Sequence, residues 1–172
     1  MAESTSGLTA DIWPVLKSFD VAHVAHVPDA GHASTIKAAE ADSAVRTVVL
    51  TTEEEGIGYL CGAWLGGDRG VLLMQSSGVG NCINTLGLQQ NTAFPLLMIV
   101  TMRGEWAEFN PWQIPMGHAT RDVLEAMGVL TWHVDKASEV KDIVHGAARM
   151  AYESERACAV LLGQRLIGAK KW

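Results

Sequence analysis

The sequence has few cysteines and no pattern of metal ligands. Its three cysteines, Cys61, Cys82 and Cys158, are odd in number and form no Cys-x-x-Cys pair. They therefore indicate neither a disulfide framework nor a zinc site, and we expect each to be a small buried side chain. The histidine spacing also lacks a His-Glu-x-x-His pair, so we predict no metal ligand in the chain.

Basic clusters and long apolar runs are missing as well. The chain has 13 Lys and Arg against 19 Asp and Glu, a net charge of −6, which argues against a nucleic-acid partner. Its longest apolar runs, such as residues 95–100, are far shorter than the roughly 20 residues that span a bilayer. The polar, acidic start does not resemble a secretory signal. We expect a cytoplasmic protein without a membrane partner.

The remaining sequence is that of one globular domain with a regular alternation of elements. Its 172 residues, 48% of them apolar, contain no internal repeat or linker. Mostly continuous apolar runs alternate with helical segments, which predicts an α/β domain, a doubly wound, mostly parallel six-stranded sheet with helices on both faces. The predicted strands are 21–27, 46–51, 71–75, 96–101, 130–134 and 157–162, and the predicted helices are 12–19, 34–41, 53–65, 81–90, 119–127 and 138–153.

One segment interrupts this alternation. Residues 102–117 form a connection far longer than the two to six residues usual between a strand and a helix, and such loops tend to be functional. We expect its Trp106 and Trp112 to pack against a partner subunit or line a pocket. His32 and His118 lie in predicted loops at helix starts, where either function or a plain capping role is open.

An acidic triplet, Glu53-Glu54-Glu55, follows a predicted strand and begins a predicted helix. Acidic residues in a first helical turn stabilise it by about 0.3–1 kcal/mol each, which is one interpretation. Adjacent helical residues point about 100° apart, so one carboxylate can also turn toward the sheet edge and serve in proton transfer. The triplet alone leaves both interpretations open.

A glycine-bearing segment follows the third predicted strand, Gln75-Ser76-Ser77-Gly78-Val79-Gly80-Asn81. It is not a dinucleotide fingerprint, because Ile83 stands where the third glycine belongs. It also lacks the Gly-Lys-Ser/Thr ending of a P-loop and the first glycine of a nucleophile elbow. We expect a tight turn that places small polar groups at the carboxyl edge of the sheet.

Taken in order, several segments resemble one known family. They are Val27-Pro28, residues 53–67 and 74–81, and residues 102–105 with 113–117. The set is similar to the α subunit of sulfopyruvate decarboxylase and to the N-terminal half of phosphonopyruvate decarboxylase, over about residues 13–162. The resemblance implies a single pyrimidine-binding (PYR) domain of a thiamine diphosphate enzyme across residues 1–172, with a core of about 11–165. Two positions depart from the family pattern, His26 and Ser76.

The resemblance also implies roles for individual residues. Counted from Gly62, Glu53 matches the catalytic glutamate, which hydrogen-bonds N1′ of the cofactor's aminopyrimidine. Arg103 suits a second anionic group on the substrate, because guanidinium binds such groups bidentately. The cofactor is expected to contact Val27, Pro28, Glu53, Gln75, Ser76, Ser77, Gly78 and Asn81, and the substrate His32, Arg103, Gln113 and His118.

One motif of these enzymes is absent: the Gly-Asp-Gly segment with a downstream Asn that binds Mg²⁺ and the diphosphate. The resemblance therefore implies a partner β subunit that carries this motif, in an α2β2 or larger assembly. The implied reaction is decarboxylation of a small 2-oxo acid with a second anionic group, such as sulfopyruvate or phosphonopyruvate, to an aldehyde and carbon dioxide. A carboligase of the acetolactate synthase type and a non-catalytic regulatory α/β subunit remain the alternatives.

Overall fold

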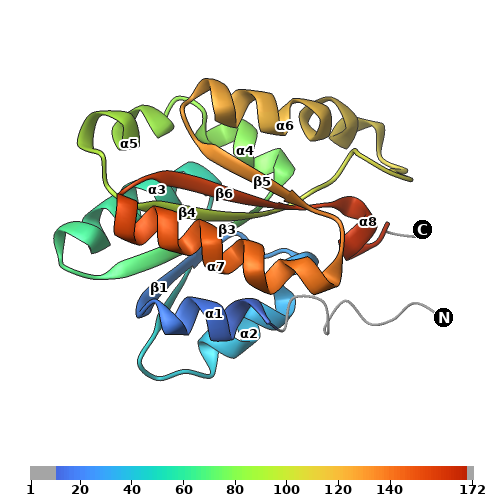
Figure 1. The fold of residues 1–172 in the computed structure, drawn as a ribbon. Coiled ribbons are helices and arrows are strands. Elements are labelled where there is room, and N and C mark those ends of the chain that lie inside the picture. The colour runs from blue at the N-terminus through green and yellow to red at the C-terminus, as the bar shows by residue number, and fades with distance from the viewer. Residues whose placement is uncertain (1–10, 170–172) are drawn as a thin grey trace.

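The computed structural model describes residues 11–169 and contains one six-stranded parallel sheet (Figure 1). The strand order is β2-β1-β3-β4-β6-β5, and every neighbouring pair is parallel. This confirms the doubly wound α/β fold expected from the alternating pattern. The strands are β1 (Val21–His26), β2 (Arg46–Val49), β3 (Arg69–Gln75), β4 (Leu96–Thr101), β5 (Leu130–Val134) and β6 (Ala157–Leu162).

Helices cover both faces of the sheet. In Figure 1, α1, α2 and α7 lie on one side, and α3, α4, α5 and α6 lie on the other. The helices are α1 (Ile12–Ser18), α2 (Ala33–Glu40), α3 (Glu53–Leu65), α4 (Ser76–Cys82), α5 (Leu86–Thr92), α6 (Ile114–Ala126), α7 (Ala137–Ser154) and α8 (Gln164–Ile167), with 3₁₀ turns η1 (Ala30–His32) and η2 (Pro111–Gln113).

The central strands β3 and β4 are apolar along most of their length because both of their faces are buried. Leu73 and Ile99 belong to the core cluster under α1 and α7, whereas Leu72 and Met98 belong to the cluster under α3, α4 and α5. All four side chains are fully buried. Burial of one such side chain contributes about 1.5–3 kcal/mol, so the strands hold the two helical layers together.

Predicted and observed bounds agree closely for the strands. Strands β4, β5 and β6 have the predicted bounds, and the other three differ by at most two residues at either end. Helix α3 also begins and ends where its apolar pattern predicts. The three cysteines are buried and free, as expected.

Three predictions about connections are wrong. The expected turn at residues 75–81 is helix α4, and the expected helix at 81–90 is two helices separated by Ile83, Asn84 and Thr85, all weak helix formers. The expected start of a helix at residue 119 is also wrong. Helix α6 begins at Ile114, because Pro115 lies in the first turn, where its missing N–H costs little. His118 is therefore inside a helix rather than in a loop.

Candidate active site

The carboxyl ends of the central strands gather the residues of interest at one edge of the sheet. Asp29 follows β1, Glu53 follows β2, helix α4 follows β3 and Arg103 follows β4. In open parallel α/β sheets, ligands bind outside this edge. The fold therefore brings together segments that lie up to 74 residues apart in the sequence.

Glu53 is the first residue of α3, and the acidic triplet separates as its helical geometry predicts. Glu53 is only 8% exposed, Glu54 is half-buried and Glu55 is exposed. Glu55 accepts a hydrogen bond from the Thr51 N–H at 2.9 Å. Of the three carboxylates, the structure buries Glu53 most deeply.

The Glu53 carboxylate lies against helix α4. The Asn81 side-chain amide donates to Glu53 Oε2 at 3.1 Å, and within residues 11–169 no group hydrogen-bonds Oε1. A Cβ atom on Gly78 would lie 2.2 Å from the Glu53 carboxyl carbon, so this close approach requires glycine. Burial, and then the negative charges of Glu53 and Glu54, raise the pKa of the nearby Cys82 thiol to about 12. One carboxylate oxygen is thus fixed, and the other is available to a ligand.

This arrangement fits the pyrimidine end of thiamine diphosphate. A ring nitrogen takes one hydrogen bond from a carboxyl group, and Glu53 Oε1 can make it.

Within the described part of the chain, no three His, Cys, Asp or Glu side chains are placed to hold a metal ion. No helix there is long and apolar enough to cross a membrane.

Asp29 is a central residue of this edge that the sequence analysis missed. Its Oδ1 accepts from Gln75 Nε2 at 3.2 Å, and its Oδ2 accepts from Thr101 Oγ1 at 2.7 Å and Gly31 N at 3.1 Å. Gln75 Oε1 in turn accepts from Ser77 Oγ at 3.0 Å. The only sequence signal was its place directly after Val27-Pro28 at the end of a strand. Asp29 orients Gln75, and through it the Ser77 hydroxyl.

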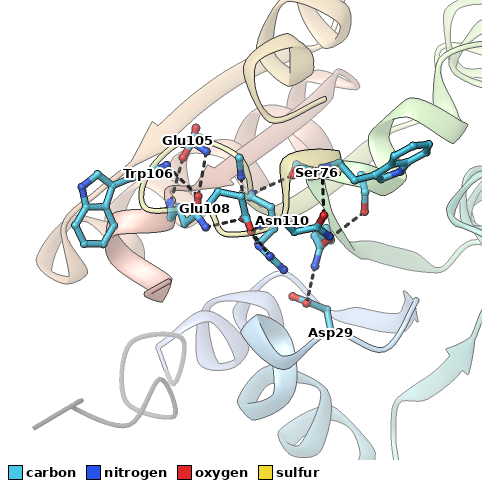
Figure 2. Close-up of polar contacts among 12 residues, drawn as sticks. Asp29, Ser76, Glu105, Trp106, Glu108 and Asn110 are labelled. Atoms are coloured by element: carbon cyan, nitrogen blue, oxygen red, sulfur yellow. Dashed lines mark hydrogen bonds and ion pairs between the residues drawn. The ribbon is translucent and has the colours of Figure 1, made fainter. Parts of the chain in front are cut away.

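Arg103 forms a buried ion pair with Glu108, whose polar contacts are drawn in Figure 2. Its Nε and Nη2 donate to the two Glu108 oxygens at 2.6 and 2.5 Å, and the side chains are 7% and 2% exposed. The Arg103 N–H also donates to Ser76 Oγ at 3.0 Å. The edge of the guanidinium that was expected to bind a substrate anion therefore binds Glu108.

Glu108 accepts further hydrogen bonds from its own loop and from α8. The donors are the N–H groups of Gly104 and Asn110 and the side-chain amide of Gln164, at 2.9–3.2 Å. The hydrogen bond from Arg103, which outweighs the effect of burial, lowers the pKa of Glu108 to about 2. Neither Glu108 nor Gln164 was singled out by the sequence, because their pairing joins residues 56 positions apart.

Val27 and Pro28, two of the expected cofactor contacts, lie directly after β1. His32, an expected substrate contact, lies at the end of the 3₁₀ turn that follows them. His32 is fully buried, and its Nε2 lies 3.0 Å from the Met74 carbonyl oxygen. Val27 is half-buried and packs on the core under α3. Pro28 lines a cavity of about 680 Å³ on the α2 side, together with His26 and Asp29. Burial lowers the pKa of His26, so this ring is neutral at pH 7.

The other expected substrate residues lie around the start of α6. Gln113 ends η2, and its buried Oε1 has no hydrogen-bond partner within the described residues. His118 is exposed on α6. Trp112 is 86% exposed and lines an apolar groove with Pro111, Pro115 and Met116. The expected contacts of Gln113 and His118 with substrate, and of Trp112 with a pocket or a partner subunit, stay predictions.

Comparison with solved structures defines the class of protein. The chain superimposes with a TM-score of 0.69 on 2-oxoglutarate:ferredoxin oxidoreductase from Magnetococcus marinus, solved with 2-oxoglutarate, coenzyme A and succinyl-CoA bound. The match covers 93% of this chain and 29% of that one, at 13% identity. The fold is therefore a doubly wound α/β domain of the kind that forms part of this larger oxidoreductase.

Sequence relatives then give the family. The chain is 33% identical over 152 residues to sulfopyruvate decarboxylase subunit alpha of Methanococcus maripaludis, covering 88% of this chain and 91% of the relative. It is 32% identical over 152 residues to the same subunit of Methanothermobacter thermautotrophicus, covering 88% and 92%. The chain belongs to the family of sulfopyruvate decarboxylase α subunits. No family model matches it.

A longer relative shares only this domain with the chain. Phosphonopyruvate decarboxylase of Streptomyces viridochromogenes is 36% identical over 118 residues, which are 67% of this chain and 30% of that protein. The chain thus spans less than a third of this relative's length. The rest of that longer protein lies outside the alignment.

Proposed function

We propose that this chain is the α subunit of a heteromeric, thiamine diphosphate-dependent 2-oxo acid decarboxylase. The substrate is a small 2-oxo acid with a second anionic group, and the products are an aldehyde and carbon dioxide. The observation that carries the proposal is the Glu53 carboxylate, buried at the carboxyl edge with Oε2 held by Asn81 and Oε1 available. The names of the family's α subunits support the reaction class.

Glu53 performs the proton chemistry in this proposal. Its Oε1 would hydrogen-bond N1′ of the pyrimidine ring when the cofactor is bound, and the 8% exposure of the side chain limits competition by water. The Asn81 amide fixes the direction of the carboxylate, so its free oxygen faces the ligand. When bound, thiamine diphosphate supplies the electron sink for loss of carbon dioxide.

The other expected cofactor contacts lie along one connected surface. The Ser77 hydroxyl donates to Gln75, so its lone pairs remain free to accept hydrogen bonds. Asp29 holds Gln75 in that orientation. We infer that Val27, Pro28, Gln75, Ser77 and Gly78 border the cofactor, whereas the Ser76 hydroxyl anchors the Arg103 backbone.

A partner β subunit completes the proposed enzyme. The chain has no Gly-Asp-Gly segment, so the Mg²⁺ and the diphosphate are assigned to the partner in an α2β2 or larger assembly. The relatives of similar length are named α subunits, which supports a second chain. His118 and Gln113 remain the proposed substrate contacts, because Arg103 is bound by Glu108 and His32 is fully buried.

The test is the Glu53→Gln variant, assembled with the β subunit that co-purifies with the chain. A glutamine cannot exchange a proton with N1′, so we expect kcat to fall by at least about 10²-fold, the scale of general acid–base catalysis. The measurement is aldehyde release from 2-oxo acids with neutral, carboxylate, sulfonate and phosphonate tails. Absence of any co-purifying chain with a Gly-Asp-Gly segment would contradict the heteromer.

Glu55→Gln is the matched control, because Glu55 belongs to the same triplet, is exposed and keeps an acceptor oxygen for the Thr51 N–H. It is expected to keep the parental rate. An assembled Glu53→Gln enzyme with the parental rate would refute the proposed role and favour a regulatory subunit.

A further inference from the structure

A second, smaller cavity lies at the carboxyl edge, between α6 and the ends of β4, β5 and β6. Its volume is about 280 Å³. Helix α4 packs on both α3, which carries Glu53, and α6, which lines the cavity, so α4 connects the two sites. Met102 and Leu161 give it an apolar floor, and Glu105, His118, Arg121 and His133 supply its polar wall.

The one carboxylate of this wall is already satisfied. Glu105 Oε1 lies 2.9 Å from His133 Nε2, and Oε2 accepts from the Gln164 N–H at 3.1 Å. The hydrogen bond to Glu105 raises the pKa of His133 above its ordinary value. Burial opposes ionisation of Glu105, but the hydrogen bonds from His133 and Gln164 still hold its pKa below its ordinary value. Glu105 therefore needs no further cation.

The two basic side chains that α6 contributes, His118 and Arg121, have no hydrogen-bond acceptor within the described residues. Within residues 11–169, His118 makes no hydrogen bond, and its one interaction is electrostatic, with Glu105, whose pKa it helps to lower. Arg121 Nε lies 3.8 Å from Glu125 Oε1, too far for a hydrogen bond, and that oxygen accepts from Thr131 Oγ1 instead. Asp135, the other nearby acid, lies 3.5 Å from His133 Nδ1. The wall thus carries the donors of His118 and Arg121, which have no hydrogen-bond acceptor in the part of the chain that the structure describes, beside an apolar floor.

We propose that this cavity binds one small organic anion, a carboxylate, sulfonate or phosphonate on a short carbon chain. Arg121 and His118 donate to its oxygens, and Met102 and Leu161 pack against its carbon atoms. A volume just below the usual 300–1,000 Å³ of small-molecule sites suits a ligand of this size. The planar guanidinium recognises all three anions through paired N–H donors.

Two sources can supply such an anion. It is either the second anionic group of the 2-oxo acid, in which case the inference rests on the proposed function, or a separate effector with the same chemistry. Binding by the chain is common to both sources. Binding is measured without turnover, so a chain that does not bind the anion is distinguishable from an enzyme that does not decarboxylate its substrate.

The test uses the full chain, titrated with methanesulfonate and with methylphosphonate by isothermal titration calorimetry. We expect saturable binding at one site per chain, with the ring signals of His118 and His133 shifting in ¹H–¹⁵N spectra. The signals of His145, which packs on Phe19 at 5.1 Å, should not move. Hydrogen bonds to charged groups contribute about 1.5–3 kcal/mol, so Arg121→Gln and His118→Gln should each weaken binding more than about tenfold.

Arg149→Gln is the matched control, because Arg149 also pairs with an acid one helical turn away, Glu153, but on α7. Its affinity should equal that of the parent. In the assembled enzyme, a higher KM in Arg121→Gln only for substrates with an anionic tail assigns the anion to the substrate. An unchanged KM, with non-competitive effects of methanesulfonate, assigns it to an effector. Absence of saturable binding, or equal affinity in both cavity variants and the parent, overturns the proposal.

Discussion

At the scale of single residues, the position of Glu53 depends on the absence of a side chain at Gly78. The Glu53 carboxyl group lies where a Cβ on residue 78 would have to be. Asn81, one helical turn further along α4, then fixes Oε2. The glycine that resembles a turn signal in the sequence is therefore required by the close approach of two helices.

The Gly78→Ala variant tests this close approach. The added methyl group would lie 2.2 Å from the Glu53 carboxyl carbon, so the carboxylate must move. We expect a loss of about 1–3 kcal/mol of folding stability from overpacking and a fall in kcat larger than the loss of folded protein explains. Thermal unfolding and steady-state kinetics of the assembled enzyme measure the two effects.

Gly58→Ala is the control for Gly78→Ala, since a Cβ there meets no atom within 4 Å in the middle of α3. It should stabilise the chain by about 0.5–1 kcal/mol and leave kcat unchanged. Equal kinetic effects of the two substitutions would show that the close approach to Glu53 is not what matters.

At the scale of elements, the connection between β4 and α6 is ordered by one buried carboxylate. Glu108 binds Arg103 at the end of β4, two N–H groups of its own loop and Gln164 of α8. The backbone N–H groups of Glu105 and Trp106 both donate to Gln164 Oε1 at 3.0 Å, which fixes the start of the same connection. A segment that looks irregular in the sequence is thus fixed by charge and hydrogen bonding.

We expect Glu108→Gln to destabilise the chain by about 3 kcal/mol, because it leaves the Arg103 charge buried without its counter-ion. The pKa of Glu108 is about 2 in the folded chain, below its ordinary value of 4.5. A depressed folded-state pKa gives stability that is full above pH 4.5 and is lost as pH falls toward 2. Between pH 6 and pH 2, the free energy of unfolding measured with denaturant should therefore fall less in Glu108→Gln than in the parent.

The control for Glu108→Gln is Glu139→Gln, whose pair with Lys136 at 3.0 Å is exposed on α7. Exposed pairs contribute about 0–1 kcal/mol, so both its stability and its acid profile should match the parent. An acid profile of Glu108→Gln that is parallel to the parent's would show that this carboxylate does not titrate on unfolding.

At the scale of the whole molecule, a parallel sheet buried on both faces makes the two core clusters one cooperative unit. Cys82 lies in the cluster under α3 and Cys158 in the cluster under α7, and both are fully buried. Burial raises the pKa of each thiol to about 12. Neither thiol forms a reactive thiolate at neutral pH in the folded state.

Labelling of these two cysteines therefore requires global opening. We expect their reaction with a thiol reagent at pH 7 to follow the unfolding free energy as denaturant is added, with the same slope for both. Mass spectrometry of the labelled peptides measures each rate. Rapid labelling of Cys158 alone in the native state would show that the face under α7 opens separately.

The sequence by itself determined the architecture and the main candidate. Mostly continuous apolar runs, clearest in β4 and β6, indicate a sheet buried on both faces, because only a doubly covered sheet hides them from water. The acidic triplet lies at a strand-to-helix junction, and the family resemblance, counted from Gly62, selects Glu53 within it. These features are local, so periodicity and position along the chain express them.

Only the tertiary structure decided which side chains pair. Arg103 looks like an anion receptor in the sequence, yet Glu108 binds its guanidinium and Gln164 completes the network. Asp29 reaches Gln75 and Thr101 only because parallel strands bring their carboxyl ends together. Such pairings join residues far apart in the chain, and no local pattern records them. Packing of α6 on β5 likewise forms the cavity that carries Arg121 and His118.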